Sequence, residues 1–156
     1  MLYHYTHIFP TPVGEMTLFA DETGLRRILP GGYPCNESIP CKTPLIQEAI
    51  DQLEEYFSGA RKDFTLPLAP QGTSFQRAVW LSLSQIPYGT TESYKELALR
   101  VGCPKGFQAV GQANARNPLP FLFPCHRVIA ADGAPGGYVL GPDLKAWLLT
   151  LERTHR

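Results

Sequence analysis

The chain changes its sequence pattern once, near residues 67–72, and this change constrains the fold more than any other feature. Before it, alternating or apolar runs at residues 3–9, 15–20 and 25–29 are separated by turn sequences, which is typical of short antiparallel strands. After it, apolar residues follow helical spacing. The segment Pro67-Leu68-Ala69-Pro70-Gln71-Gly72 is rich in proline and indicates a linker. We therefore expect two domains, residues 1–70 and 71–156.

The first domain is expected to combine a sheet with one helix. Thr43 is a helix N-cap with Pro44 at the first helical position, and apolar residues keep helical spacing from Leu45 until Gly59. One more strand is expected at residues 64–68. This pattern predicts a small α/β domain with an antiparallel sheet.

The second domain is expected to be mostly helical. Ser74 is the expected N-cap of a helix, and Ser93 and Glu96 form a capping box that opens another helix to about residue 101. Gly102-Cys103-Pro104 predicts a tight turn, followed by a helix over residues 105–115. Two short helices around such a turn indicate a helix-turn-helix.

The helix over residues 105–115 has an unusual share of small residues. They are Gly106, Ala109, Gly111, Ala113 and Ala115. Small residues allow a neighbouring helix to pack closely, and they also allow a helix to lie close to a narrow groove. The sequence leaves both interpretations open.

The run Pro124-Cys125-His126-Arg127-Val128 carries the clearest chemistry in the chain. A thiol becomes a strong nucleophile when it ionises, and a nearby cation or a positioned base favours ionisation. An apolar stretch flanks this run, and a glycine-rich loop, residues 133–141, follows it. The pattern predicts a reactive thiol on a short buried element, although the pentad alone also fits an inert core cysteine.

Several motifs, taken in order, resemble the O6-alkylguanine-DNA alkyltransferases, also called methylated-DNA–protein-cysteine methyltransferases. The resemblance is dense from Ser74 to Glu152 and loose over residues 1–70. The motifs are Pro87-Tyr88-Gly89, Ser93-Tyr94, Glu96-Leu97-Ala98, Ala109-Val110-Gly111, Asn117-Pro118, the pentad with Ile129, Gly136-Gly137-Tyr138, and Trp147-Leu148-Leu149 with Glu152.

The resemblance implies an α+β fold and a reaction. The N-terminal domain would be ribonuclease H-like, and the C-terminal domain would be a mostly helical, winged helix-turn-helix-like domain. The alkyl group of O6-alkylguanine, and of O4-alkylthymine, would pass irreversibly to Cys125 in one turnover. The resemblance implies no cofactor and no metal.

The resemblance also assigns roles to four residues. Cys125 would accept the alkyl group, His126 would act on it as a base through water, and Glu152 would orient His126. Tyr94 would donate its phenolic proton to the leaving guanine. Without the resemblance, Glu152 would be read as a solvated residue near a helix end. Arg127 fits either a phosphate ligand or a structural ion pair.

The remaining implied site residues form two groups. The lesion pocket and its support would comprise Asn117, Pro120, Tyr138, Val139 and Leu140. The contacts to DNA would come from Ser93, Lys105, Gln108, Ala109 and Arg116. The chain departs from the family pattern in two places. Gln108 replaces an arginine that fills the gap left by a flipped base, and Val139-Leu140 replace smaller residues.

Charge and cysteine content set the expected partners and location. Residues 1–70 carry five Lys and Arg against nine Asp and Glu, whereas residues 71–156 carry nine against five. This asymmetry suits a C-terminal half that faces a polyanion. The resemblance implies that the helix over residues 105–115 enters the minor groove of double-stranded DNA. We expect a monomer that does not bind a membrane. The first residues lack a secretory signal pattern, so we expect a cytoplasmic protein, associated with the nucleoid if prokaryotic.

Cys35 and Cys41, six positions apart, give little support for a zinc site with His4 or His7.

Two other functions compete with alkyl transfer. One is a weakly active sensor of alkylated DNA that resembles the alkyltransferase-like proteins, which lack the acceptor cysteine. Gln108 favours this alternative, whereas Cys125 argues against it. The other is a Cys-His hydrolase, for which direct adjacency of Cys125 and His126 is an unusual geometry.

Overall fold

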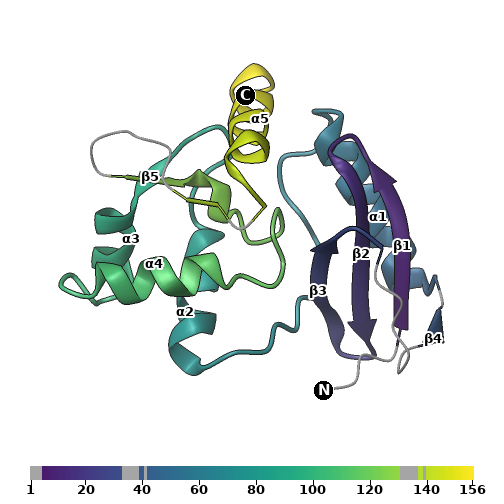
Figure 1. Cartoon of the computed structure of the whole chain (residues 1–156), viewed down its shortest axis with the longest axis horizontal. Helices are drawn as coiled ribbons and strands as arrows, with labels where there is room; N and C mark the ends of the chain where they lie inside the picture. Colours follow the sequence, from purple (N-terminus) through teal and green to yellow (C-terminus); the bar gives the residue numbers. More distant parts are fainter. Residues whose placement is uncertain (1–4, 33–38, 41, 131–136, 139) are drawn as a thin grey trace. The chain divides into compact units, whose positions relative to one another are not determined.

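The computed structural model describes residues 5–32, 39–40, 42–130, 137–138 and 140–156, and the whole chain is drawn in Figure 1. The chain divides into two compact units, Met1–Gln71 and Gly72–Arg156. Among the described residues, none of the helices combines the length and apolar character that a membrane span requires.

A four-stranded sheet forms the N-terminal unit together with one helix. The strands lie in the order β3-β2-β1-β4 and comprise β1 (Tyr5–Thr11), β2 (Gly14–Asp21), β3 (Gly24–Pro30) and β4 (Ile39–Pro40). β1, β2 and β3 pair in antiparallel fashion, and β4 adds in parallel beside β1. The three antiparallel strands expected from the sequence are confirmed. The first runs on to Thr11, where Gly14 at φ 112° completes a tight hairpin turn.

Helix α1 (Pro44–Phe57) covers one face of this sheet, as Figure 1 shows. The Thr43 side chain accepts a hydrogen bond from Ile46 N at 3.2 Å, which confirms the predicted N-cap. The face of α1 that packs on the sheet is buried and includes Ile46, Ala49, Ile50, Leu53, Tyr56 and Phe57. Together with buried sheet residues such as Leu18, Leu25 and Ile28, these side chains form the hydrophobic core of the unit.

The prediction of a strand at residues 64–68 is wrong. The segment makes one isolated bridge, between Leu68 and Leu25, with Leu25 N donating to Pro67 O at 2.9 Å. Pro67 has no N–H with which to continue a ladder. Upstream of it, Thr65 N donates to the Gln52 side chain of α1 at 2.9 Å. The segment is therefore hydrogen-bonded to a side chain of α1 rather than paired along a neighbouring strand.

The C-terminal unit consists mainly of helices. They are α2 (Ser74–Leu83), α3 (Tyr94–Arg100), α4 (Phe107–Ala115), the short 3₁₀ helix η1 (Cys125–Arg127) and α5 (Pro142–Thr154). Two short strands, β5 (Glu92–Ser93) and β6 (Val128–Ile129), pair in parallel. They place the start of α3 beside the residues that follow Cys125.

The predicted helices are confirmed, with two corrections at their ends. Thr73, not Ser74, caps α2, because Thr73 and Gln76 form a reciprocal capping box. The Ser93–Glu96 capping box is present as predicted. Helix α4 begins at Phe107 rather than at residue 105, because the preceding chain still turns there, with Gly106 N donating to Cys103 O at 2.8 Å.

Two polar side chains, Trp80 and Arg100, hold the helices of this unit in place. Trp80 Nε1 of α2 donates to Ala113 O of α4 at 2.7 Å, and the indole is fully buried. Arg100 at the end of α3 donates to Ser82 O at 2.6 Å and pairs with Glu92 at 2.6 Å. These contacts fix α3 and α4 on α2, so the side chains at the start of α3 have a defined position.

Candidate active site

A folded loop after α4 delivers the cysteine to its position. Asn117 spans this loop, because its Nδ2 donates to Phe123 O at 2.8 Å and its Oδ1 accepts from Leu119 N at 3.0 Å. Phe121 adopts φ 73°, the only positive φ of a non-glycine residue in the described part of the chain. Such a conformation costs about 1–3 kcal/mol and needs support from its surroundings. Asn117 supplies part of that support.

Cys125 lies at the start of η1 and is 1% exposed. Burial raises the pKa of its thiol to about 11, although the Asn117 side chain and the Lys145 ammonium act in the opposite direction. The sequence suggested a thiol activated by its cationic neighbours. The structure corrects this for the resting protein, because desolvation outweighs them. The thiol is therefore neutral at pH 7.

His126 and Glu152 form a fully buried pair next to this thiol. His126 Nε2 lies 2.6 Å from Glu152 Oε2. Burial would raise the pKa of Glu152, but bonds from His126 and Arg127 lower it to about 2. Because an ionised carboxylate only accepts hydrogen bonds, His126 Nε2 carries the hydrogen, and Nδ1 has the lone pair of a base. Burial lowers the pKa of His126, so the imidazole is neutral at pH 7.

Arg127 is the second partner of Glu152. Its Nε donates to Glu152 Oε1 at 2.8 Å, and its Nη1 donates to Ile86 O at 2.7 Å. Arg127 Nη2 also donates to Glu152 Oε2 at 3.1 Å, and Gly89 N donates to Glu152 Oε1 at 3.1 Å. Arg127 is 5% exposed, so the ion-pair interpretation is confirmed. The solvated alternative for Glu152 is wrong, since its side chain is 1% exposed.

Lys145 of α5 is a site residue that sequence reasoning missed. Its side chain is fully buried, and Nζ donates to Val128 O at 2.6 Å and to Gly137 O at 3.2 Å. Lys145 and Cys125 influence each other's pKa, which places a buried cation near the thiol. A signal was present, because Lys145 shares one helical face with Leu148 and Glu152 at positions i, i+3 and i+7.

Two phenols also face Cys125. Burial, followed by the charge of Cys125, raises the pKa of both Tyr94 and Tyr138. The Tyr138 ring meets the His126 ring edge-on, with centroids 6.3 Å apart. The structure therefore gathers Cys125, His126, Glu152 and Tyr94, which are separated in the sequence, around one centre.

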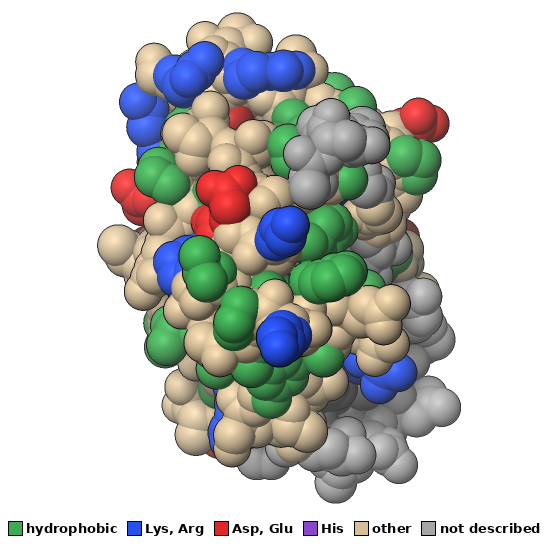
Figure 2. Space-filling view, turned by 90° about the vertical axis from the view of Figure 1, so that its left-hand side faces the viewer, with side chains coloured by type: hydrophobic (Ala, Val, Ile, Leu, Met, Phe, Trp, Pro, Cys, Tyr) green, Lys and Arg blue, Asp and Glu red, His purple; other side chains and the backbone are tan. Residues whose placement is uncertain are grey.

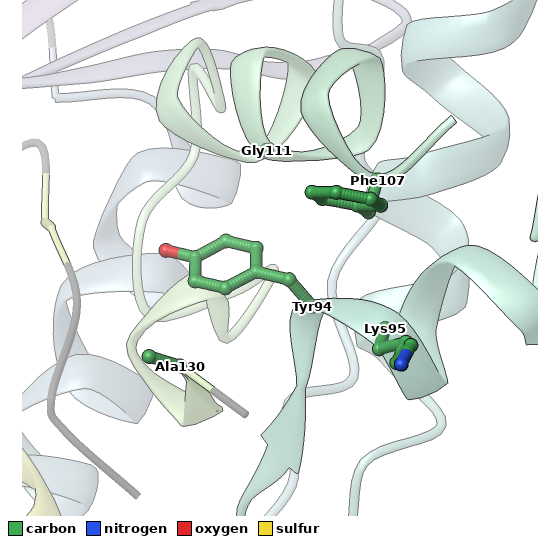
Figure 3. A pocket seen from close by; sticks show the side chains of 5 residues that line it. All are labelled: Tyr94, Lys95, Phe107, Gly111 and Ala130. Atoms are coloured by element: carbon green, nitrogen blue, oxygen red, sulfur yellow. The ribbon is translucent and has the colours of Figure 1, made fainter. Parts of the chain in front are cut away.

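An apolar pocket of about 480 Å³ opens beside Tyr94. Its lining includes Tyr94, Lys95, Phe107, Gly111 and Ala130. Figure 3 shows the Tyr94 ring beneath the turn of α4 that carries Gly111, with its hydroxyl directed away from Phe107. The pocket is large enough for one base, and the Tyr94 phenol lies on its wall.

The residues expected to contact DNA lie mostly on the surface of α4 and its flanks. Lys105, Gln108, Ala109 and Arg116 are exposed, whereas Ser93 is half-buried and its hydroxyl caps α3. Figure 2 shows separate Lys and Arg side chains with hydrophobic ones between them on one face of the molecule. Phe107, at 49% exposure, is one of the exposed hydrophobic residues.

Three further positions complete the residues expected at the site. Pro120 is buried and forms a bridge with Phe123 in the loop before Cys125. Leu140 is half-buried ahead of α5, and Val139 lies outside the described residues. Cys35 and Cys41 lie outside them as well, and the described residues contain no group of three His, Cys, Asp or Glu that could hold a metal ion.

The C-terminal unit thus combines a buried thiol beside a buried His–Glu pair with two packed helices, α3 and α4, of which α4 also carries exposed residues. Family models match both parts of the chain. The ribonuclease-like domain of 6-O-methylguanine DNA methyltransferase matches residues 1–70, and the DNA binding domain of that family matches residues 74–154. The chain therefore belongs to the 6-O-methylguanine DNA methyltransferase family.

Relatives and solved structures agree with this placement. A methylated-DNA–protein-cysteine methyltransferase of Methanosarcina barkeri is 42% identical, covering 97% of this chain and 98% of its own. A constitutive one of Bacillus subtilis is 44% identical and covers 92% of each chain. The crystal structure of Mycobacterium tuberculosis OGT in complex with DNA matches with a TM-score of 0.89 and 37% identity, over 97% of this chain and 94% of that one. These matches favour the methyltransferase over the sensor, and the expected α+β fold is confirmed.

Proposed function

We propose that this chain repairs DNA by direct reversal, taking the alkyl group from O6-alkylguanine, and also from O4-alkylthymine, onto Cys125 Sγ. The bond between the base oxygen and the alkyl carbon breaks, and a carbon–sulfur bond forms. The thiol proton passes to His126, and the departing base gains a proton. The thioether does not revert, so each molecule acts once. The observation that carries this proposal is the buried Cys125 beside the His126–Glu152 pair.

The proton path follows from the electrostatics of the site. The pKa of Cys125, about 11, keeps a proton on the resting thiol, and His126 is neutral and can accept it through one water at Nδ1. Glu152 then stabilises the imidazolium that forms, as the third member of a nucleophile–base–orienter arrangement. Arg127 holds the carboxylate in place by donating to both of its oxygens.

Tyr94 is the proposed acid for the leaving base. Its ring lines the pocket, and burial and the negative charge that Cys125 gains on ionising raise the pKa of its hydroxyl. Negative charge grows on the base oxygen and ring as the alkyl group departs, and a phenolic O–H stabilises that charge. Asn117 and Pro120 hold the loop that presents Cys125, while Tyr138 and Leu140 are the described residues that we assign to the wall of the lesion pocket.

We propose that residues 71–156 bind duplex DNA through α4, as a monomer in the minor groove. Lys105 and Arg116 contact phosphates at the ends of the helix, and Gln108 and Ala109 lie in the groove, with Ser93 on the adjacent helix. The lesion must be flipped out of the stack to reach a buried thiol, which costs a few kcal/mol of unstacking. Residues 1–70 form the N-terminal α/β domain. The proposed location is the cytoplasm, on the nucleoid if prokaryotic.

Mass spectrometry of the protein after reaction with methylated DNA tests the assignment of Cys125. We expect one methyl group on the peptide that contains Cys125, and none after Cys125→Ala, while the variant still binds the duplex. Cys125→Ser should behave nearly the same, because a hydroxyl ionises far less readily than a thiol. Cys103→Ser is the matched control and should accept methyl normally. A methyl group on Cys35, Cys41 or Cys103 of the intact protein would refute the proposal.

A further inference from the structure

The Tyr94 ring packs against α4 at Gly111. A Cβ at Gly111 would lie 3.8 Å from Tyr94 Cδ1 and 3.9 Å from Cε1, so the ring packs directly on this part of the helix. Figure 3 shows the ring under that turn, with the hydroxyl pointing along the helix and away from Phe107. The hydroxyl therefore points away from the first turn of α4.

Asn114 lies on the same face of α4, three residues after Gly111. It is 4% exposed, and its Oδ1 makes no hydrogen bond with the described part of the chain. Burial and the charge of Cys125 raise the pKa of Tyr94, and the Asn114 side chain lowers it, which places the amide beside the phenolic oxygen. Asn114 is thus a buried amide next to the hydroxyl that faces the lesion.

The anchoring of α4 does not account for this amide. Trp80 Nε1 already bonds Ala113 O in the last turn of α4, and the Asn114 backbone oxygen accepts from Asn117 N at 3.3 Å. Buried polar atoms normally find partners, so an amide oxygen without one points to a role other than stability. The neighbour that this side chain acts on is Tyr94.

A phenol has one hydrogen to donate, so its neighbours decide where that hydrogen goes. A carboxamide that donates through Nδ2 to the phenolic oxygen leaves the phenolic hydrogen free to point into the pocket. We propose that Asn114 is a positioning residue that donates to the Tyr94 oxygen and so directs the phenolic hydrogen toward the leaving base. This inference rests on the role proposed above for Tyr94.

A double-mutant cycle with Tyr94→Phe tests the inference. The measured quantity is the single-turnover rate constant for methyl transfer from a methylated duplex to Cys125. Asn114→Leu should slow transfer by roughly tenfold, a modest share of a typical general-acid contribution. In the Tyr94→Phe background the same substitution should change the rate by less than about twofold, because the phenolic hydrogen is already absent. DNA affinity and melting temperature should change little.

Asn114→Asp gives a second test that is nearly isosteric. As a carboxylate, Asp only accepts hydrogen bonds and would take the phenolic hydrogen away from the base, so transfer should slow by more than in Asn114→Leu. Its rate relative to wild type, compared at the same pH, should recover toward acid pH, because the protonated carboxyl regains a donor. A purely structural role would give no such recovery.

Three outcomes would overturn the inference. One is a wild-type rate for both Asn114 variants, and the second is a loss that stays the same size in the Tyr94→Phe background. The third is an unchanged rate for Tyr94→Phe alone, which removes the role of Tyr94 on which the inference rests. Methyl transfer to Cys125 would continue in that case, so the proposed function would stand while the inference fails.

Discussion

The two units bury different kinds of polar group. In the described part of the N-terminal unit, the buried polar side chains are neutral, namely Thr6, Thr17 and Gln52. In the C-terminal unit they include four ionisable residues, His126, Arg127, Lys145 and Glu152. Burying charge costs more than burying an amide or a hydroxyl, and the pairing of charges offsets that cost only in part. The C-terminal unit therefore gives up stability to place ionisable groups around Cys125.

The largest test of this contrast compares Glu152→Gln with Gln52→Leu. Glu152→Gln leaves Arg127 buried without its counter-charge, and we expect a loss of about 3–5 kcal/mol in the free energy of unfolding. Gln52→Leu removes a neutral amide that bonds Glu48 and Thr65, and should cost about 1–3 kcal/mol. Urea unfolding of both variants tests this comparison. For each variant, the free energy of unfolding is measured for the unit that carries the substitution.

The pH dependence of stability adds a check with a defined sign. The folded-state pKa of Glu152, about 2, lies below its ordinary 4.5. The carboxylate therefore contributes stability that is complete above pH 4.5 and is lost as the pH falls toward 2. Glu152→Gln should lack this part of the acid loss. Equal costs for the two substitutions, or an identical acid profile, would show that charge burial does not distinguish the units.

Lys145→Met should produce the next largest effect, on reactivity. Removing the buried ammonium takes away a cation that lowers the pKa of Cys125, so that pKa should rise further above about 11. Transfer should slow by about tenfold if the ammonium is worth one pKa unit. The pH dependence of iodoacetamide labelling, read on the peptide that contains Cys125, measures the shift.

Lys95→Met is the matched control for Lys145, because Lys95 lines the pocket but is exposed. It should leave the pKa of Cys125 unchanged. If Lys145→Met labels at the same pH as wild type, then Lys145 only ties Val128 and Gly137 to α5, and the buried charge has no part in reactivity.

Gln108 offers a smaller test, confined to flipping of the base. Glutamine is shorter than arginine and has no charge, so it holds the gap left by a flipped base less well, unless Phe107 acts as an apolar wedge. Gln108→Arg should speed repair of duplex DNA several-fold and leave reaction with a free alkylated base almost unchanged. Parallel rate measurements on duplex and free base decide this. A slower duplex reaction, or equal changes in both rates, would show that position 108 does not fill the gap.

Local sequence rules predicted much of the fold, because short-range chemistry sets the elements concerned. Capping by Thr43 and the Ser93–Glu96 box fixed two helix starts, and turn residues separated the three long strands. The rules failed where a distant group decided the outcome. Residues 64–68 look like a strand, but Gln52 of α1 engages Thr65. The two-residue strands β5 and β6 are too short to leave a pattern.

The site shows the same division between local and distant effects. The resemblance supplied Cys125, His126, Glu152 and Tyr94, and the structure brings them together. The resemblance did not supply Lys145 or Asn114, because their importance depends on burial and on neighbours from other elements. The protonation of the thiol could not be predicted either, because desolvation of Cys125 exists only after the chain has packed around it.

The smallest expected effect concerns the surface charge of the C-terminal unit. Lys105 and Arg116 flank α4 and are exposed, so each should contribute one phosphate contact. Lys105→Ala or Arg116→Ala should weaken binding to all duplexes alike and reduce the slope of log affinity against log salt by about 1. Arg27→Ala, an exposed cation of the N-terminal unit, is the control and should leave that slope unchanged. If Arg27→Ala reduces the slope as much, then DNA contacts extend to the N-terminal unit and are not confined to the C-terminal unit. A strong preference for one undamaged sequence would instead contradict binding through the minor groove, where little sequence can be read.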